Sequence, residues 1–203
     1  NLILVEGYMD VVSLFNKGIK NVAATLGTAM TTSQVSLAWK NFDKIIICFD
    51  GDQSGIDASY RAAEKILKII KPGKDIYFAK IPNGQDPDDF VNQFGKEGFN
   101  SLMKQSKDLI DIIFDNHVIG VNKSKPSDIA LLEKKLFNLT DEIEDQISKK
   151  YVKNAFKNKI FEKIIKKKNL IPQSQEDIKK ASLRLMLSKE EIIELSLINL
   201  ILN

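Results

Sequence analysis

The sequence is poor in residues that form covalent or metal cross-links. Its 203 residues include one cysteine, Cys48, and one histidine, His117. One cysteine cannot form an internal disulfide, and together with one histidine it cannot supply the four ligands of a structural zinc site. The fold must therefore rest on an apolar core, and a hydrophobic content of 43% is sufficient to build one.

Long apolar segments are absent as well. No run approaches the roughly 20 apolar residues that cross a bilayer, and the N-terminus lacks the order of a signal peptide. We therefore expect a cytoplasmic globular protein. The first five residues, Asn1–Val5, contain no Met and resemble a strand already begun, which indicates a segment of a longer protein.

The small net charge of +3 hides an uneven distribution. Residues 1–100 contain 11 Lys or Arg and 12 Asp or Glu, whereas residues 101–203 contain 19 and 15. Most of the excess lies between Lys149 and Lys168, where nine lysines accompany one acid and an apolar residue recurs at every fourth position. This pattern predicts an amphipathic helix with a cationic face.

Short apolar or β-branched runs alternate with stretches of helical periodicity in the first half of the chain. The predicted strands are 2–5, 21–25, 44–49 and 75–81, and the predicted helices are 8–16, one that begins at 31, and 57–70. This alternation predicts an α/β fold with a parallel sheet and right-handed crossovers. Such sheets carry their ligand sites at the carboxyl ends of the strands.

After Pro87 the strand signals stop. Helical patterns cover 87–93, 95–104, 108–118, 127–137 and 143–168. We therefore predict an α/β domain over 1–93 and an all-α subdomain over 94–170. A linker near Pro172 then leads into the start of another helical domain over 171–203.

Acidic residues follow the predicted strands. Glu6 comes directly after the first strand, and Asp50 and Asp52 come directly after the third, with Gly51 between them. Because the carboxyl ends of parallel strands meet at one edge, we expect these carboxylates to converge. Like charges in a partly desolvated cluster raise one another's pKa, and a divalent cation with oxygen ligands removes that cost. The pattern predicts a site for Mg²⁺, with Mn²⁺ as its substitute.

Three further acids extend this cluster. Asp10 lies one turn into the first helix, and Asp86 and Asp88 lie in the loop after the fourth strand. Asp10 could reach the same pocket, and the two loop acids predict a second metal position. A single acid at a strand end is more often a turn former or a helix cap, and Asp57 and Asp89 are consistent with that role alone.

Four motifs occur in the first half of the chain. They are Glu6-Gly7-Tyr8-Met9-Asp10, Leu26-Gly27-Thr28, Phe49-Asp50-Gly51-Asp52-Gln53-Ser54-Gly55 and Asp86-Pro87-Asp88-Asp89. In this order and spacing they resemble the Toprim domain of bacterial DnaG-type primases. The Glu and the Asp-x-Asp are typical of Toprim proteins in general, including topoisomerases and some nucleases, whereas the other elements narrow the resemblance to primases. It covers about residues 1–93 and implies a Rossmann-like, mainly parallel sheet flanked by helices.

The resemblance implies a DNA-directed RNA primase that makes short RNA primers for DNA replication by metal-dependent nucleotidyl transfer. Its catalytic residues would be Glu6, Asp50 and Asp52. Its metal ligands would be Glu6, Asp10, Asp50, Asp52, Asp86 and Asp88. Glu6 would be either a ligand or the proton acceptor of the attacking hydroxyl. Gly27 and Thr28 would lie near the nucleotide or the template, and a simple loop glycine is the alternative for Gly27.

The same resemblance implies a set of partners. They are a single-stranded DNA template, NTPs, the RNA primer and, through a C-terminal region, the replicative helicase of the primosome. In the lysine-rich helix, Lys153, Lys157 and Lys163 would contact nucleic acid, although a solvated lysine-rich face is the more common explanation of such a pattern. Primases of this type carry a zinc-binding domain and a basic subdomain before the Toprim strand, and neither precedes Asn1. We therefore expect zinc only in such a preceding domain, and weak or no activity from the chain alone.

Two other functions stay open. A Toprim-type nuclease would use the same metals for water-mediated phosphodiester cleavage, although the Tyr8-Met9-Asp10 and Asp86-Pro87-Asp88 blocks argue against it. A non-catalytic Toprim module that recruits a replication or repair partner would bind neither Mg²⁺ nor Mn²⁺.

Overall fold

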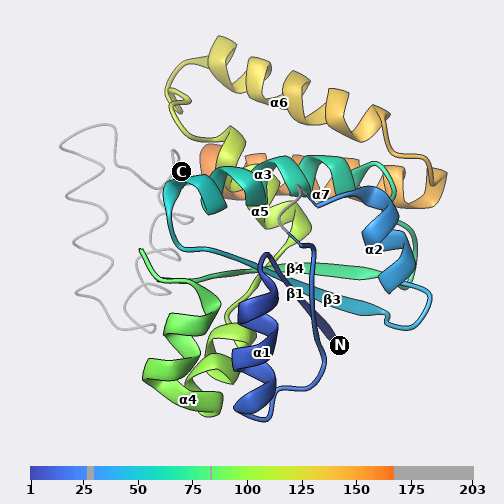
Figure 1. The fold of residues 1–203 in the computed structure, drawn as a ribbon. Coiled ribbons are helices and arrows are strands. Elements are labelled where there is room, and N and C mark those ends of the chain that lie inside the picture. The colour runs from blue at the N-terminus through green and yellow to red at the C-terminus, as the bar shows by residue number, and fades with distance from the viewer. Residues whose placement is uncertain (27–29, 83, 167–203) are drawn as a thin grey trace, which may run out of the picture. The chain divides into compact units, whose positions relative to one another are not determined.

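The chain is described by a computed structural model that covers residues 1–26, 30–82 and 84–166. The predicted linker, the predicted domain over 171–203, and Gly27 and Thr28 lie outside the described residues. Figure 1 shows the arrangement of the elements. In chain order they are β1 Leu2–Val5, α1 Tyr8–Asn16, β2 Val22–Ala24, α2 Thr32–Ala38, β3 Lys44–Phe49, α3 Gln53–Leu67, β4 Asp75–Lys80, α4 Pro87–Lys104, β5 Lys107–Asp108, α5 Leu109–His117, α6 Pro126–Asp141, α7 Gln146–Ile160 and the π-helix η1 Phe161–Lys166.

The five strands form one sheet in the order β2-β1-β3-β4-β5. β1 pairs in parallel with β2 and β3, and β3 pairs in parallel with β4, so the predicted mainly parallel α/β fold is confirmed. The prediction that no strand follows Pro87 is wrong, because β5 pairs antiparallel with β4. This strand has two residues, Lys107 and Asp108, and both are exposed charged residues that give no apolar alternation.

Helices cover both faces of the sheet (Figure 1). On one face, Ile3 and Ile46 pack with Phe99 of α4 in a core that α1 also joins through Leu14. Because side chains alternate along a strand, the neighbouring residue Ile47 points to the other face, where α3 and α5 lie. Each such fully buried side chain stabilises the fold by about 1.5–3 kcal/mol. The two cores fix the directions of the strands and therefore the edge at which they end.

The helical predictions differ from the structure mainly at helix ends. α3 begins at Gln53 and not at 57, because Asp52 caps it. The predicted helices 87–93 and 95–104 form α4, interrupted at Gly95, whose φ of 67° is not helical. The single helix predicted over 143–168 is replaced, within the described residues, by α7 and the π-helix η1, which follows it in the sequence.

The lysine-rich helix buries its predicted apolar stripe. Val152, Phe156 and Ile160 of α7 are buried, and α7 packs with α5 and α6. Asn1–Ile160 form one compact unit, and η1, which begins at Phe161, lies outside it. The predicted domain boundaries at 93 and 170 stay predictions. In the portion of the chain that the structure describes, no helix has the length and apolarity to cross a membrane.

Candidate metal centre at the carboxyl edge of the sheet

Four of the six predicted metal ligands meet at the carboxyl edge of the sheet. Glu6 follows β1, Asp50 follows β3, Asp86 lies in the loop after β4, and Asp10 comes from the first turns of α1. These four residues line an open cavity of about 450 Å³ together with Gly7, Tyr8, and Leu26. The convergence expected from parallel strands is therefore present for these acids.

The loops that carry Asp50 and Asp86 are joined through their backbones. The Gly51 N–H donates to the Gln85 carbonyl over 2.8 Å, and the Gly84 N–H donates to the Gly51 carbonyl over 3.4 Å. A Cβ atom on Gly51 would lie 2.1 Å from the carbonyl oxygen of Pro82. Gly51 is therefore required by the close approach of the Pro82 backbone.

Asp52 and Asp86 both cap helices. One oxygen of Asp52 accepts from the Gly55 N–H over 2.7 Å at the start of α3, and one oxygen of Asp86 accepts from the Asp89 N–H over 2.6 Å at the start of α4. Asp52 is exposed and is not among the residues that line the cavity. The capping role considered for Asp89 belongs in this structure to Asp86.

Asp10 links α1 to α4. Its side chain is 6% exposed, and its two oxygens accept from the Gly7 N–H over 3.0 Å and from the Asp88 N–H over 3.3 Å. The side chain of Asp88 is held separately, because its Oδ1 accepts from the Ser13 hydroxyl and from Asn92 Nδ2, the latter over 2.6 Å. Sequence reasoning missed Ser13 and Asn92. Ser13 lies 75 residues from Asp88 and carries no motif, so no sequence signal could have found it.

Burial, together with the charges of neighbouring acids, raises the pKa of Asp50, Glu6 and Asp10. Burial, followed by the charges of Glu6, Asp10, Asp86 and Asp52, raises the pKa of Asp50 to about 6. Burial is also the main cause of the raised pKa of Glu6 and of Asp10, although backbone N–H donors oppose it at both. Across the described residues, none of the six acids forms an ion pair with Lys, Arg or His, so no positive side chain offsets this repulsion.

Carboxylate oxygens in a negatively charged pocket are the donors that a hard divalent cation prefers. The residues therefore fit such a cation in chemistry and in charge. As the described side chains stand, however, no group of three or more His, Cys, Asp or Glu is arranged to hold a metal ion. A bound cation would therefore have to draw the carboxylates together.

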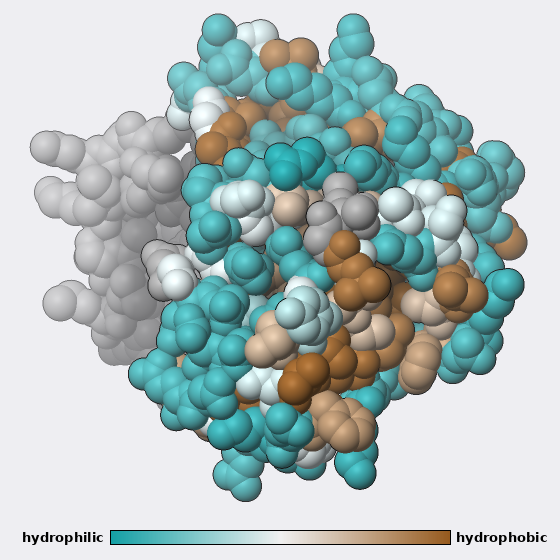
Figure 2. Space-filling model, viewed as in Figure 1, coloured by the Kyte–Doolittle hydropathy of each residue, from teal (hydrophilic) through white to brown (hydrophobic). Residues whose placement is uncertain are grey.

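The rim of the cavity is apolar. Tyr8 and Leu26 line it and are 65% and 68% exposed, and Leu26 has a positive φ of 61°. Met9 and Val12 extend the exposed apolar surface along α1, and Figure 2 shows hydrophobic residues gathered on this side of the molecule. Tyr8 belongs to the first of the four motifs but was not predicted as a site residue. Its exposed side chain lines the cavity beside the acids and makes it a candidate site residue.

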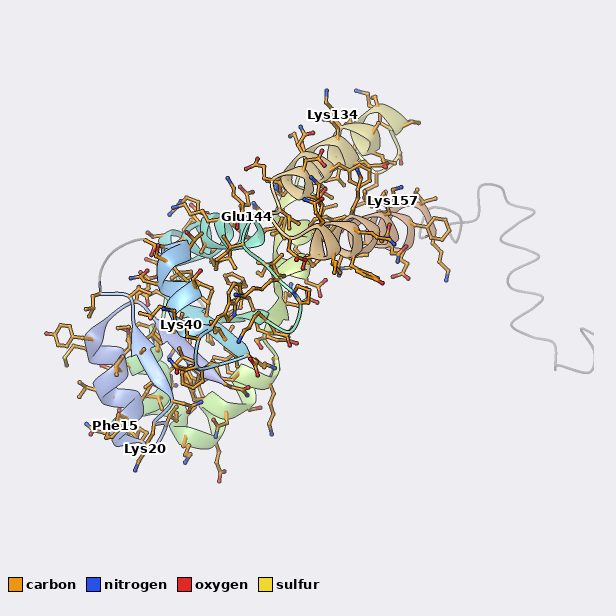
Figure 3. The ribbon with its side chains drawn as sticks, turned by 90° about the vertical axis from the view of Figure 1, so that its right-hand side faces the viewer. Phe15, Lys20, Lys40, Lys134, Glu144 and Lys157 are labelled. Carbon is orange, nitrogen blue, oxygen red and sulfur yellow. The ribbon has the colours of Figure 1, made fainter. Side chains whose placement is uncertain are left out.

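The three lysines predicted to contact nucleic acid are not among the residues that line this cavity. Lys153 and Lys157 of α7 lie over the ring of Phe137 of α6, with Nζ 4.7 and 5.6 Å from its centroid, and Figure 3 labels Lys157 on its helix. Lys163 lies in η1. Two of the three lysines thus also have a packing role.

Comparisons with known proteins point to one family. Residues 3–91 match the family described as Toprim-like. The DNA primase of Rickettsia prowazekii is 36% identical over 181 residues, which are 89% of this chain and 30% of that protein.

Solved structures agree with this match. A structure of the DnaG catalytic core superposes with a TM-score of 0.74 at 34% identity, over 78% of this chain and 51% of that chain. A DnaG primase catalytic domain bound to ssDNA superposes with a TM-score of 0.73 at 34% identity, over 78% and 50%. The chain therefore spans about 30% of the curated relative and about half of each solved chain.

Proposed function

Because the chain belongs to the DnaG-type primase family, whose catalytic core its Toprim-like domain matches, we propose that it carries the nucleotidyl-transfer centre of a DNA-directed RNA primase. In that reaction a ribonucleotide 3′-hydroxyl attacks the α-phosphate of an incoming NTP, and pyrophosphate leaves. The observation that supports it best is the convergence of Glu6, Asp10, Asp50 and Asp86 on one cavity, where none of the described Lys, Arg or His residues forms an ion pair with them.

We propose that Mg²⁺, or Mn²⁺ in its place, is bound by the acids predicted from the sequence, which are Glu6, Asp10, Asp50, Asp52, Asp86 and Asp88. The metal would neutralise charge on the attacking and leaving oxygens and orient the triphosphate. Asp52, Asp86 and Asp88 each have one oxygen held by a described hydrogen bond, which limits how far each carboxylate can turn. Glu6 would be either a ligand of this metal or the acceptor of the proton of the attacking hydroxyl, and burial, which raises its pKa, makes its carboxylate a stronger base for the second role.

The apolar rim supports a place for the nucleotide base. The exposed ring of Tyr8 lies beside the acids, and any base can stack on an aromatic ring without sequence preference. Gly27 and Thr28, which follow the rim residue Leu26, remain proposed neighbours of the nucleotide or template. Template, NTPs and primer are thus proposed to meet at the cavity, and the protein is proposed to act in the cytoplasm with the replication machinery and its helicase.

The primase proposal is tested by substituting Asp50 and Asp52 with Asn in the full-length protein. Synthesis of labelled RNA from NTPs on a single-stranded template is expected to be lost. Urea unfolding in the presence of EDTA should show that the variant is at least as stable as the unsubstituted protein. Asp57→Asn is the matched control, because Asp57 is exposed on α3 and bonds to Gln53 over 2.8 Å.

Three results would contradict the primase proposal in different ways. Undiminished synthesis by the Asp50/Asp52 variant would overturn it. Mg²⁺-dependent cleavage of end-labelled DNA without NTPs would favour the nuclease. Failure of the unsubstituted protein to bind Mg²⁺ or Mn²⁺ in calorimetry would favour the non-catalytic module.

The three lysines are a separate proposal for nucleic-acid contact, supported by their charge and by the ssDNA-bound relative. Replacing Lys153, Lys157 and Lys163 with Gln should weaken binding to single-stranded DNA. It should also reduce the slope of log affinity against log salt by about two, since each phosphate contact on a single strand contributes about 0.7. If the unsubstituted protein and the triple Gln variant showed equal salt slopes, these lysines would make no contact with nucleic acid and would serve only as a solvated helix face.

A further inference from the structure

Ser13 and Asn92 form a small polar network around Asp88 between α1 and α4. The Ser13 hydroxyl and Asn92 Nδ2 both donate to Asp88 Oδ1, and Asn92 Nδ2 also lies 3.4 Å from the Ser13 oxygen. The two helices lie side by side on one face of the sheet (Figure 1). The network therefore joins one turn of α1 to the first turns of α4.

The network continues to the cavity through the backbone. The Asp88 N–H donates to Asp10, which lines the cavity, and Ser13 lies one turn after Asp10 on α1. The orientation of Asp88 is thus tied to the position of Asp10 by two routes, one through Ser13 and one through the peptide N–H.

We propose that Ser13 and Asn92 are positioning residues that orient Asp88 for the divalent cation, an inference that rests on the proposed function. A carboxylate oxygen has two lone-pair sites, and the two donors occupy those of Oδ1. Oδ2 is thus left for a cation while both hydrogen bonds stay in place; since Asp88 is not among the residues that line the cavity, it would bind only when the cation draws the acids together. Carboxylates that bind metals are commonly held by such outer donors, and loss of a donor weakens metal affinity by roughly 10–100-fold.

The two donors are not equivalent. Ser13 is half-buried, whereas Asn92 is exposed, so water replaces the Asn92 amide more easily than the Ser13 hydroxyl. Ser13→Ala should raise the dissociation constant for Mn²⁺ by about tenfold, and Asn92→Ala should raise it by less. Ser13→Thr keeps the hydroxyl and should restore most of the affinity.

The experiment is a titration of the 203-residue chain with Mn²⁺ at pH 8, in which calorimetry gives the affinity and electron paramagnetic resonance counts the free ion. Ser106→Ala and Asn100→Ala are matched controls. The Ser106 hydroxyl donates to the Met103 carbonyl in its own turn, and Asn100 is exposed on α4. Urea unfolding in EDTA, followed by Trp39 fluorescence, verifies that each variant folds.

A double-mutant cycle separates positioning from a general effect on the fold. The effect of Ser13→Ala on Mn²⁺ affinity should disappear in an Asp88→Ala background, because the hydroxyl then has no carboxylate to orient. An effect of equal size in both backgrounds overturns the inference, as does unchanged or tighter Mn²⁺ binding by Ser13→Ala alone. Absence of Mn²⁺ binding by the unsubstituted chain overturns the proposed function as well, which distinguishes the two failures.

Discussion

The raised pKa of Asp50 predicts that the charge of this residue destabilises the fold. Well below pH 3.8 both the folded and the unfolded chain hold the Asp50 proton. Between the ordinary value of 3.8 and about 6 the folded chain keeps a proton that the unfolded chain releases, so stability falls as pH rises through this window. Above pH 6 the ionised Asp50 costs the folded state the full difference.

The size of this cost follows from the pKa values. A rise from 3.8 to about 6 corresponds to about 3 kcal/mol at roughly 1.36 kcal/mol for each pKa unit. Asp50 is half-buried, so solvent still screens part of the repulsion, and we expect about 1–2 kcal/mol. Asp50→Asn removes the charge at nearly constant shape. It should therefore raise the free energy of unfolding by about 1–2 kcal/mol at pH 7.5 and by little at pH 4.

Urea unfolding in EDTA measures the effect of Asp50→Asn directly. Trp39 is the only tryptophan in the chain and is 2% exposed, so its fluorescence reports loss of the core. Asp57→Asn controls for removal of a charge that lies outside the cavity. The electrostatic reasoning would be refuted if Asp50→Asn were no more stable than the unsubstituted chain at pH 7.5, or were stabilised equally at pH 4.

Three further measurements follow. Mn²⁺ competes with the proton on Asp50, so its affinity should fall about tenfold for each pH unit below about 6; a flat calorimetric profile from pH 5 to 8 would argue against Asp50 as a ligand. Gly51→Ala should destabilise the chain in urea by more than about 2 kcal/mol through its clash with Pro82, whereas Gly73→Ala, with a φ of 77° and open space around its Cβ, should cost only about 1 kcal/mol. Thr31→Ala removes the hydroxyl that accepts the Gln34 N–H over 3.2 Å and should cost about 1 kcal/mol in the same assay, and equal stability would show that the cap is dispensable.

The central strands β1 and β3 were predictable because they are buried on both faces and appear as short apolar runs. Ile45–Phe49 is such a run, and the acid after it therefore falls at a known edge of the sheet. β5 was not predictable, because two charged residues pair with β4 through their backbones alone. Backbone pairing leaves no trace in side-chain chemistry when the strand is this short.

The acids of the site were predictable as types and positions, but their hydrogen bonds were not. Position after a strand places Asp50 and Asp86 at the cavity, whereas whether a carboxylate caps a helix or faces a neighbour depends on side-chain torsions. The contact between Ser13 and Asp88 depends on how α1 packs against α4, which no local pattern specifies. Long-range packing therefore decides the part of the site that the sequence leaves open.

The loop at Gly51 and the loop at Gly84 are held together by backbone contacts and not by charged side chains. Because main-chain hydrogen bonds and the missing Cβ of Gly51 hold these two loops together, Asp50, which caps no described helix, contributes little to the shape of the edge. The Asp50 side chain can therefore be exchanged while the backbone of the edge keeps its form, whereas Asp52 and Asp86 also hold helix ends. The negative charge at this edge of the sheet can therefore change while its backbone stays the same, both in evolution and in design.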